Sequence, residues 1–224
     1  MIRRLLVLAT HPDDEVIAAG GLLARTVAAG GRTGVCFVTQ AGSDKNSPEM
    51  ITSKRAEAEA ANRELGTHDL YWAGFAARSL DAVPASNLIG ALDEVVKKFN
   101  PTTLCIPFVH DLNTDHQATA RAALVIARPG RYKGLCEVLY MNECTSSTQF
   151  STQGQVFKPD VYVDVDGAPM ARKLAAFSCY SSQLQGEGRP RSQEYLSVCC
   201  RADGIAAGMG HAETFQLVWS LWRA

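Results

Sequence analysis

The sequence contains no C-x-x-C motif, no long apolar run and no block of like charge. Its seven cysteines are odd in number and scattered, so neither a disulfide framework nor a thiolate zinc site is predicted, and a reducing cytoplasm is the expected location. No apolar run approaches the roughly 18 residues of a membrane span, and the stretch 5–9 is too short for the core of a signal peptide. Because 22 Lys and Arg balance 23 Asp and Glu, neither a nucleic acid nor an anionic membrane is expected as a partner.

The composition that is present fits one globular domain over residues 1–224, with 46% apolar and 20% charged residues. Short apolar runs alternate with helical patterns along the whole chain. The expected strands are 5–9, 33–39, 69–72, 103–107, 138–141, 161–165 and 215–219, and the expected helices are 16–29, 48–65, 85–99, 117–127, 170–180 and 192–207. This alternation predicts an α/β fold, a Rossmann-like and mostly parallel sheet with helices on both faces.

The first expected strand leads into an unusual acidic segment, His11-Pro12-Asp13-Asp14-Glu15. Open α/β sheets bind ligands just past the carboxyl ends of their strands, where this segment lies. His11 and Asp14 can converge on a divalent metal, which leaves Asp13 for acid–base work. The alternative is a helix N-terminus, at which three carboxylates merely favour the positive end of the helix dipole and His11 is incidental.

A second polar segment, His110-Asp-Leu-Asn-Thr-Asp-His116, follows the expected strand 103–107 and favours the metal interpretation. A catalytic zinc has three protein ligands and an open position for water, and His116 is the best candidate for the third ligand. Asp115 can orient a histidine from behind. Asp13 would then accept a proton from the metal-bound water, whose pKa falls to about 7. Zinc is expected, and another divalent metal is possible.

The segment His-Pro-Asp-Asp-Glu15 after a short N-terminal strand resembles the signature of the PIG-L/LmbE-like family of zinc-dependent de-N-acetylases. Further blocks resemble the family in the same order and extend the resemblance over nearly the whole chain. These blocks are Arg55-Ala-Glu57 with Leu65-Gly66, Asp111–His116 with Ala127-Arg-Pro129, Lys158–Asp164 with Lys173 and Tyr180–Gln183, and Ala212–Phe215.

The resemblance implies that His11, Asp14 and His116 are the zinc ligands and that Asp13 is the general base. It implies hydrolysis of the N-acetyl group of a GlcNAc-type sugar or its conjugate, with release of acetate and a free amine. The metal would stabilise the oxyanion that develops on the attacked carbonyl. Arg55 matches a substrate-binding arginine of the family, and its alternative is a salt bridge on its own helix. Self-association as a homo-oligomer is also implied.

One position departs from the family pattern, because many members have His-x-Asp-His where this chain has Asn113. An Asn amide can donate a hydrogen bond to an oxyanion but cannot titrate. The oxyanion contact therefore stays open between Asn113, His110 and His211, and His110 and His211 are candidates for substrate binding. For His211 a purely structural role is equally compatible with the sequence.

Two alternative functions remain compatible with the sequence. The same scaffold can act on another N-acyl group, such as an N-formyl sugar or a non-sugar acetamide. A metal-binding protein without turnover is the other alternative, and Asp13 argues against it, because mere binding needs no free carboxylate beside the metal.

Three smaller questions are left to the structure. Glu15 either supports the site by hydrogen bonding or favours the helix N-terminus. Gly20 and Gly21 stand inside the expected helix 16–29, where each glycine destabilises the helix by about 1 kcal/mol relative to alanine. Their presence indicates either close packing of the helix or room for a substrate. The segments 143–156 and 185–191 are expected to shape the outer pocket.

Overall fold

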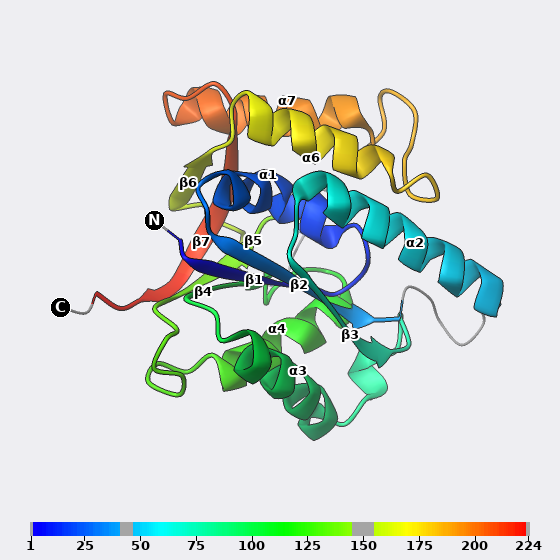
Figure 1. Ribbon diagram of the computed structural model, residues 1–224, viewed down its shortest axis with the longest axis vertical. Coiled ribbons are helices and arrows are strands. Elements are labelled where there is room, and N and C mark those ends of the chain that lie inside the picture. Colours follow the sequence, from blue (N-terminus) through cyan, green and yellow to red (C-terminus); the bar gives the residue numbers. More distant parts are fainter. Residues whose placement is uncertain (1, 41–46, 145–154, 223–224) are drawn as a thin grey trace.

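The computed structural model describes residues 2–40, 47–144 and 155–222, which form a seven-stranded sheet with helices on both faces (Figure 1). The strands are β1 (Arg4–Ala9), β2 (Arg32–Thr39), β3 (Asp69–Phe75), β4 (Thr103–Pro107), β5 (Glu137–Met141), β6 (Val161–Asp164) and β7 (Ala212–Ser220). The helices are α1 (Asp14–Ala28), α2 (Pro48–Leu65), α3 (Ala85–Phe99), α4 (Thr114–Ile126), α6 (Ala168–Ser178) and α7 (Gln193–Ala206), with a short 3₁₀ turn η1 (Leu80–Ala82). The predicted α/β fold is confirmed.

The strand order, β3-β2-β1-β4-β5-β7-β6, places the first strand in the interior of the sheet. Strands β1 to β5 are parallel, and β7 runs antiparallel to both of its neighbours. The chain moves outward from β1 to β3 and then returns to place β4 on the other side of β1. The loops after β1 and β4 therefore diverge at a topological switch point, where open α/β sheets bind their ligands.

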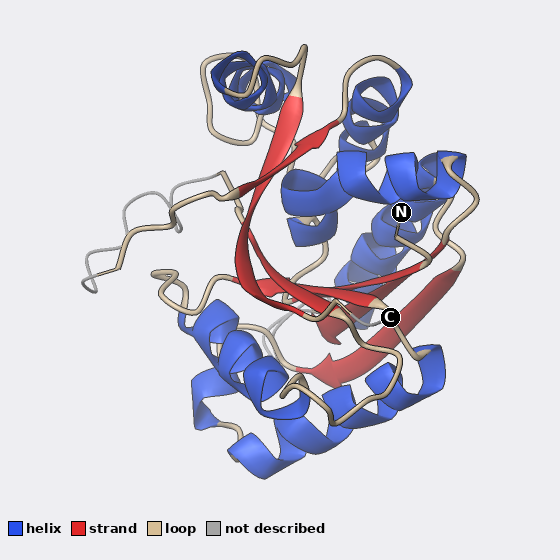
Figure 2. Ribbon diagram, turned by 90° about the vertical axis from the view of Figure 1, so that its left-hand side faces the viewer, coloured by secondary structure: helices blue, strands red, loops and turns tan. Residues whose placement is uncertain are grey.

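The sheet separates two apolar cores. Leu5, Val7 and Ala9 of β1 join the core beneath α1, α2 and α6, whereas Leu6 and Leu8 join the core beneath α3 and α4. Alternate strand side chains point to opposite faces, so a strand that is covered on both faces is apolar throughout. Figure 2 shows the two layers of helices on either side of the sheet.

Three predicted boundaries were wrong by three residues, and several others by one or two. Helix α4 begins at Thr114 rather than Gln117, because Asn113 is extended (φ −73°, ψ 117°) and its side chain accepts a hydrogen bond from the Asp115 N–H. Strand β3 continues to Phe75 through a register shift against β2. Strand β7 begins at Ala212 because it pairs with β6 as well as with β5. Most of the expected cover 143–156 lies outside the described residues.

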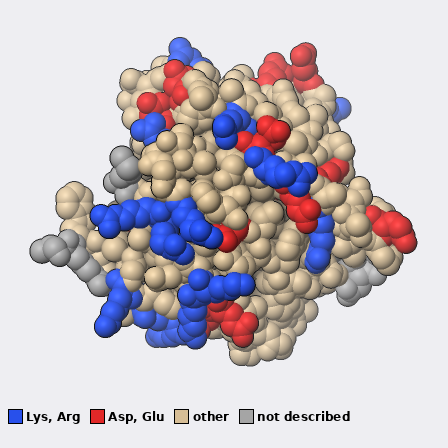
Figure 3. Space-filling model, in the orientation of Figure 1, with Lys and Arg blue, Asp and Glu red and all other residues tan. Residues whose placement is uncertain are grey.

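Among the described helices, none is both long enough and apolar enough to cross a membrane. Charged side chains of both signs lie on the face that Figure 3 shows. Lys and Arg gather on its left-hand side, where the two ends of the chain lie in Figure 1. Strand β1 begins on this side of the molecule. The carboxyl ends of the parallel strands β1 and β4 therefore lie on the opposite side.

Candidate metal centre

The loop between β1 and α1 is closed by a side-chain hydrogen bond. Asp14 Oδ2 accepts from the His11 N–H at 2.8 Å, and Asp14 N donates to the His11 carbonyl at 3.3 Å. Between them Asp13 is the N-cap of α1 with φ 118° and ψ −29°, a conformation that residues other than Gly adopt rarely. The backbone therefore turns sharply, and three candidate site residues, His11, Asp13 and Asp14, lie within four positions.

Three side-chain atoms from the two loops face one another. His11 Nδ1 lies 3.2 Å from His116 Nε2 and 3.7 Å from Asp14 Oδ2, and His116 Nε2 lies 3.4 Å from Asp14 Oδ2. Ligands of a tetrahedral zinc, at about 2.0–2.1 Å from the ion, lie about 3.3 Å from one another. Two imidazole nitrogens and one carboxylate oxygen with this spacing fit three ligands of a zinc site, which leaves one position open.

A carboxylate lies behind His11. Its Nε2 is 3.0 Å from Asp115 Oδ2, and Asp115 also accepts from the backbone N–H of Arg78 at 2.5 Å and of Leu80 at 3.0 Å. Asp115 is therefore held in place by backbone N–H groups at the start of η1. A proton on Nε2 of His11 leaves Nδ1 with its lone pair toward the metal position.

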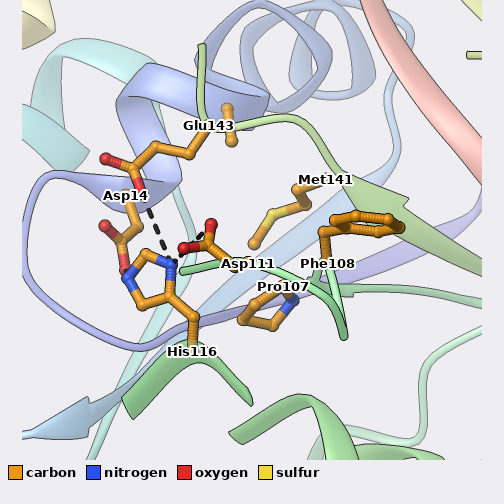
Figure 4. A pocket seen from close by; sticks show the side chains of 8 residues that line it. Asp14, Pro107, Phe108, Asp111, His116, Met141 and Glu143 are labelled. Carbon is orange, nitrogen blue, oxygen red and sulfur yellow. Dashed lines mark ion pairs between the residues drawn. The ribbon is translucent and has the colours of Figure 1, made fainter. Parts of the chain in front are cut away.

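The other histidine has the same arrangement with two carboxylates. His116 Nδ1 lies 3.3 Å from Asp111 Oδ2 and 3.4 Å from Glu143 Oε2, as the dashed lines of Figure 4 show. A small hollow opens beside these groups, and Phe108 and Met141 form part of its apolar wall. Nε2 of His116 is thereby left for the metal, and the hollow gives a small apolar group a place next to it.

Burial and charge compete at each of these groups. Burial lowers the pKa of His11, but the hydrogen bonds to Asp115 and Asp14 outweigh it and raise the pKa to about 10. Burial likewise lowers the pKa of His116, and the charge of Asp14 together with the hydrogen bond to Asp111 raises it to about 9. For Asp14, burial raises the pKa, and the charge of His116 with the His11 hydrogen bond brings it below its usual range. The carboxylates around both histidines thus favour the protonated imidazoles when no metal is bound.

Asp13 lies beside the metal group without belonging to it. It is 2% exposed, and its Oδ2 accepts no hydrogen bond from any residue that the structure describes. Arg191 Nη1 is 3.4 Å from that oxygen, within ion-pair range. Burial raises the pKa of Asp13 well above its usual value, although Arg191 opposes this shift. A carboxylate of this kind can take up and return a proton.

Comparison of the sequence with known families gives one match that includes both loops. The PIG-L family, described as GlcNAc-PI de-N-acetylase, matches residues 6–127, more than half of the 224 residues. The chain belongs to the PIG-L family. The resemblance expected from the two polar segments is thereby confirmed.

Individual relatives of this PIG-L protein are distant. YaiS of Escherichia coli K12, named an uncharacterised deacetylase, is 26% identical over 80% of this chain and 90% of its own length. A Bacillus cereus protein, named a probable N-acetyl-alpha-D-glucosaminyl L-malate deacetylase 2, is 25% identical over 55% of this chain, and the match spans only 60% of that relative. Among solved structures, the conserved protein TT1542 of Thermus thermophilus has a TM-score of 0.76 at 26% identity and covers 100% of this chain and 98% of its own.

Two further candidate residues, Asn113 and His110, belong to the same polar segment as His116. Asn113 caps α4, with its Oδ1 3.0 Å from the Asp115 N–H, so the carboxamide fixes the helix turn that carries Asp115 and His116. His110 lies in the turn after β4, and its ring packs edge-on against Phe108 with 5.6 Å between centroids. Their roles in catalysis and binding stay predictions.

The remaining two candidates have partners elsewhere. The Arg55 guanidinium lies over the Trp72 ring at 4.6 Å from its centroid, and its buried Nε has no hydrogen-bond partner among the described residues. The structure records no ion pair for Arg55 on the described part of its helix. His211 directly precedes β7, and its Nδ1 lies 2.6 Å from Oδ1 of Asp166, which follows β6. Substrate binding by either residue stays a prediction.

Several residues near the centre were not predicted. Asp111 belongs to the polar segment from which His110, Asn113, Asp115 and His116 were chosen as candidates. Glu143 follows the end of β5, the position at which a ligand-binding side chain is expected in this fold. Arg191 lies in the segment 185–191, which was expected to shape the outer pocket, but no motif in that segment singles out this residue.

Proposed function

We propose that this PIG-L protein is a divalent-metal-dependent N-deacetylase that hydrolyses the N-acetyl group of a GlcNAc-type sugar or sugar conjugate. The observation that carries the proposal is the triangle of His11, Asp14 and His116, with sides of 3.2, 3.4 and 3.7 Å, beside a buried carboxylate that is not part of it. The deacetylase names of two relatives support the reaction class, and one of those names specifies an N-acetylglucosaminyl substrate.

The donor set favours zinc among the divalent metals. His11, Asp14 and His116 would hold it, and carboxylates behind both imidazoles match the usual surroundings of metal-bound histidines. When bound, the metal lowers the pKa of a water and polarises a carbonyl oxygen. The hollow next to Met141 and Phe108 offers an apolar wall against which an acetyl methyl group can pack.

Asp13 moves the proton. Its carboxylate accepts a proton from the water whose oxygen bonds to the acetamide carbon. The C–N bond then breaks, and Asp13 delivers the proton to the departing amine nitrogen, so that acetate and a free amine leave. Burial favours the protonated carboxyl and thus helps the second half of this cycle, while Arg191 nearby favours the ionised base.

A donor for the carbonyl oxygen must also be present, because preorganised hydrogen bonds to a developing oxyanion lower the barrier most. Asn113 is the first candidate for this donor. Its Oδ1 accepts a hydrogen bond from the Asp115 N–H, and its side-chain NH₂ group can donate to the oxyanion. His110 is the second candidate at the same rim.

The test is acetate release from a panel of substrates by purified protein with and without a chelator. The panel contains free N-acetylglucosamine, a carboxylate conjugate and a nucleotide sugar of it, an N-formyl sugar, and a non-sugar acetamide. We expect acetate from at least one acetamido sugar, loss of release with chelator, and recovery with zinc. Asp13→Asn is the control variant, which should retain the metal and lose the release.

Other results would select the alternatives. Release of formate only, or release of acetate from the non-sugar acetamide only, would show that the protein is a hydrolase of another substrate class. Stoichiometric metal without turnover on any member would favour a binding protein and would contradict the proposal.

A further inference from the structure

The segment between α6 and α7, residues 179–192, reaches Asp13 at two points. Tyr180, at its beginning, donates from its hydroxyl to Glu15 Oε1 at 2.5 Å. Arg191, near its end, places Nη1 3.4 Å from Asp13 Oδ2. These residues are more than 160 positions away from Asp13 in the sequence, so the contacts exist only in the folded chain.

The first point of contact acts on the backbone of Asp13. That backbone has a positive φ of 118°, which a residue with a Cβ adopts only when its surroundings hold it there. The Asp13 N–H donates to Glu15 Oε2 at 3.1 Å, and Glu15 Oε1 accepts from both Tyr180 and the Asn62 side chain, the latter at 2.9 Å. Glu15 is completely buried, so α2 and the 179–192 segment together fix the carboxylate that fixes Asp13.

The second point of contact acts on the Asp13 side chain. The Arg191 guanidinium is one-third exposed, and it lies between Asp13 and Glu143, with Nη2 4.0 Å from Glu143 Oε1. Nη1 also donates to Gln183 Oε1 at 2.8 Å, which orients the fork. Asp13 Oδ2 accepts no hydrogen bond from the described residues, and the Arg191 guanidinium is the cation within ion-pair range of this oxygen among them.

The segment is braced internally, so its two contacts are not independent. The N–H groups of Gln183 and Leu184 both donate to the Tyr180 carbonyl at 2.9 Å, and the Gln185 N–H donates to the Arg191 carbonyl at 2.7 Å. A turn anchored at Tyr180 therefore carries Arg191 at a fixed place over the site.

We propose that the 179–192 segment positions the base: Tyr180 holds the Asp13 backbone through Glu15, and Arg191 holds the Asp13 carboxylate. The inference rests on the proposed function for the role of Asp13 as base. Among the described residues, neither Arg191 nor Tyr180 pairs with His11, Asp14 or His116, so both act through the Asp13 segment. A guanidinium suits this place because it attracts a carboxylate at every working pH without ever giving up its own proton.

The first test compares Arg191→Ala with Arg189→Ala, which removes an exposed arginine of the same segment. We expect Arg191→Ala to lower kcat about 100-fold, the loss that a misplacement of about 1 Å produces, with little change in KM or bound metal. Added guanidinium ion should restore part of kcat in Arg191→Ala only, and Arg189→Ala should behave as wild type. A rise in KM alone, loss of metal, or wild-type kcat would overturn the role of Arg191.

The second test needs no turnover and uses metal-free protein. Tyr180→Phe removes one hydroxyl, and we expect faster amide hydrogen exchange over residues 11–17 than in wild type, with no change over α3. Unchanged exchange would overturn the backbone half of the proposal. If wild-type protein releases no acetate from any substrate, the proposed function fails by itself, and this exchange experiment still decides whether the segment holds the Asp13 loop.

Discussion

A buried ion pair, Lys173 with Glu213, is inserted into the middle of α1. Lys173 Nζ lies 2.6 Å from Glu213 Oε1 and donates to the Ile17 carbonyl at 2.8 Å. The Glu213 carboxylate accepts from the N–H groups of Gly21 and Leu22 at 2.8 and 2.7 Å. Both side chains are 2% exposed. The pair thus joins α6, β7 and α1, the helix that begins at the metal centre.

Removal of one partner should be strongly destabilising. Lys173→Met has a similar stem but leaves the Glu213 charge buried without a counter-charge, and such losses amount to about 3–5 kcal/mol of unfolding free energy. For a chain of this length about 1 kcal/mol corresponds to roughly 2–4 °C in Tm, so the expected loss is about 6–20 °C. The double variant Lys173→Met with Glu213→Gln should regain part of it, because no net charge then remains buried.

The chain contains a matched control. Lys97 Nζ is also 2.6 Å from a carboxylate oxygen, that of Asp93, but the Lys97 side chain is 63% exposed. Water screens this pair, so Lys97→Met should leave Tm nearly unchanged. Thermal unfolding of the metal-free proteins, followed by circular dichroism, measures the Tm of each variant, and urea unfolding measures its unfolding free energy. Equal small losses for Lys97→Met and Lys173→Met would refute the argument that burial, rather than distance, decides the strength of the pair.

Other predictions concern the site and its helices. Asn113→Asp should keep the α4 cap, whereas Asn113→Ala should lose about 0.5–2 kcal/mol in urea unfolding; a fall of kcat in both variants would assign the oxyanion contact to the amide. Gly90→Ala should stabilise by about 0.5–1 kcal/mol, since nothing lies within 4 Å, and Gly21→Ala should destabilise by about 1–3 kcal/mol, since its Cβ would meet a valine methyl at 2.6 Å. Metal binding at pH 7 should release protons from His11 and His116, whose pKa values are about 10 and 9, as calorimetry in buffers of different ionisation enthalpy would detect. The stability that these histidines give the metal-free protein is complete below pH 6.5 and should be lost as the pH rises through 9 to 10.

The regular elements were predictable wherever local signals agree. Helix α2 begins at Pro48 after the Ser47 cap and ends before Gly66 in the left-handed conformation (φ 76°), as its sequence predicts. The start of α4 was missed because Asn113 was considered only for the chemistry of the site. Its role as a cap depends on φ and ψ, which the residue type does not determine.

The convergence of His11, Asp14 and His116 followed from one rule, that loops after parallel strands meet at one edge. The rule does not say which strands are neighbours. In the structure β1 and β4 are adjacent, and no local sequence pattern predicts this adjacency. Glu143 and Arg191 lie in the segments 143–156 and 185–191, which were expected to shape the outer pocket. No local signal singles out these two side chains, because their position depends on the packing of β5 and α6.

The two glycines of α1 and Glu15 show how a local observation stays ambiguous until its partner is known. Gly20 and Gly21 face Lys173 and Val165 at distances that leave no room for a substrate, which decides for close packing. Glu15 does not merely favour a helix end, since it accepts three hydrogen bonds in the buried interior.

The charges of the centre argue for a divalent ion rather than for any cation. Carboxylates surround His11 and His116, and in the metal-free protein the raised pKa values of both histidines mean that two protons supply two positive charges. A divalent ion bound to two neutral imidazoles replaces these protons and leaves the total charge unchanged. Asp111, Asp115 and Glu143 thus face the same compensating charge in either state, and the buried carboxylates need no rearrangement when the metal enters. A monovalent ion in the same place would supply one positive charge fewer than the two protons that it replaces.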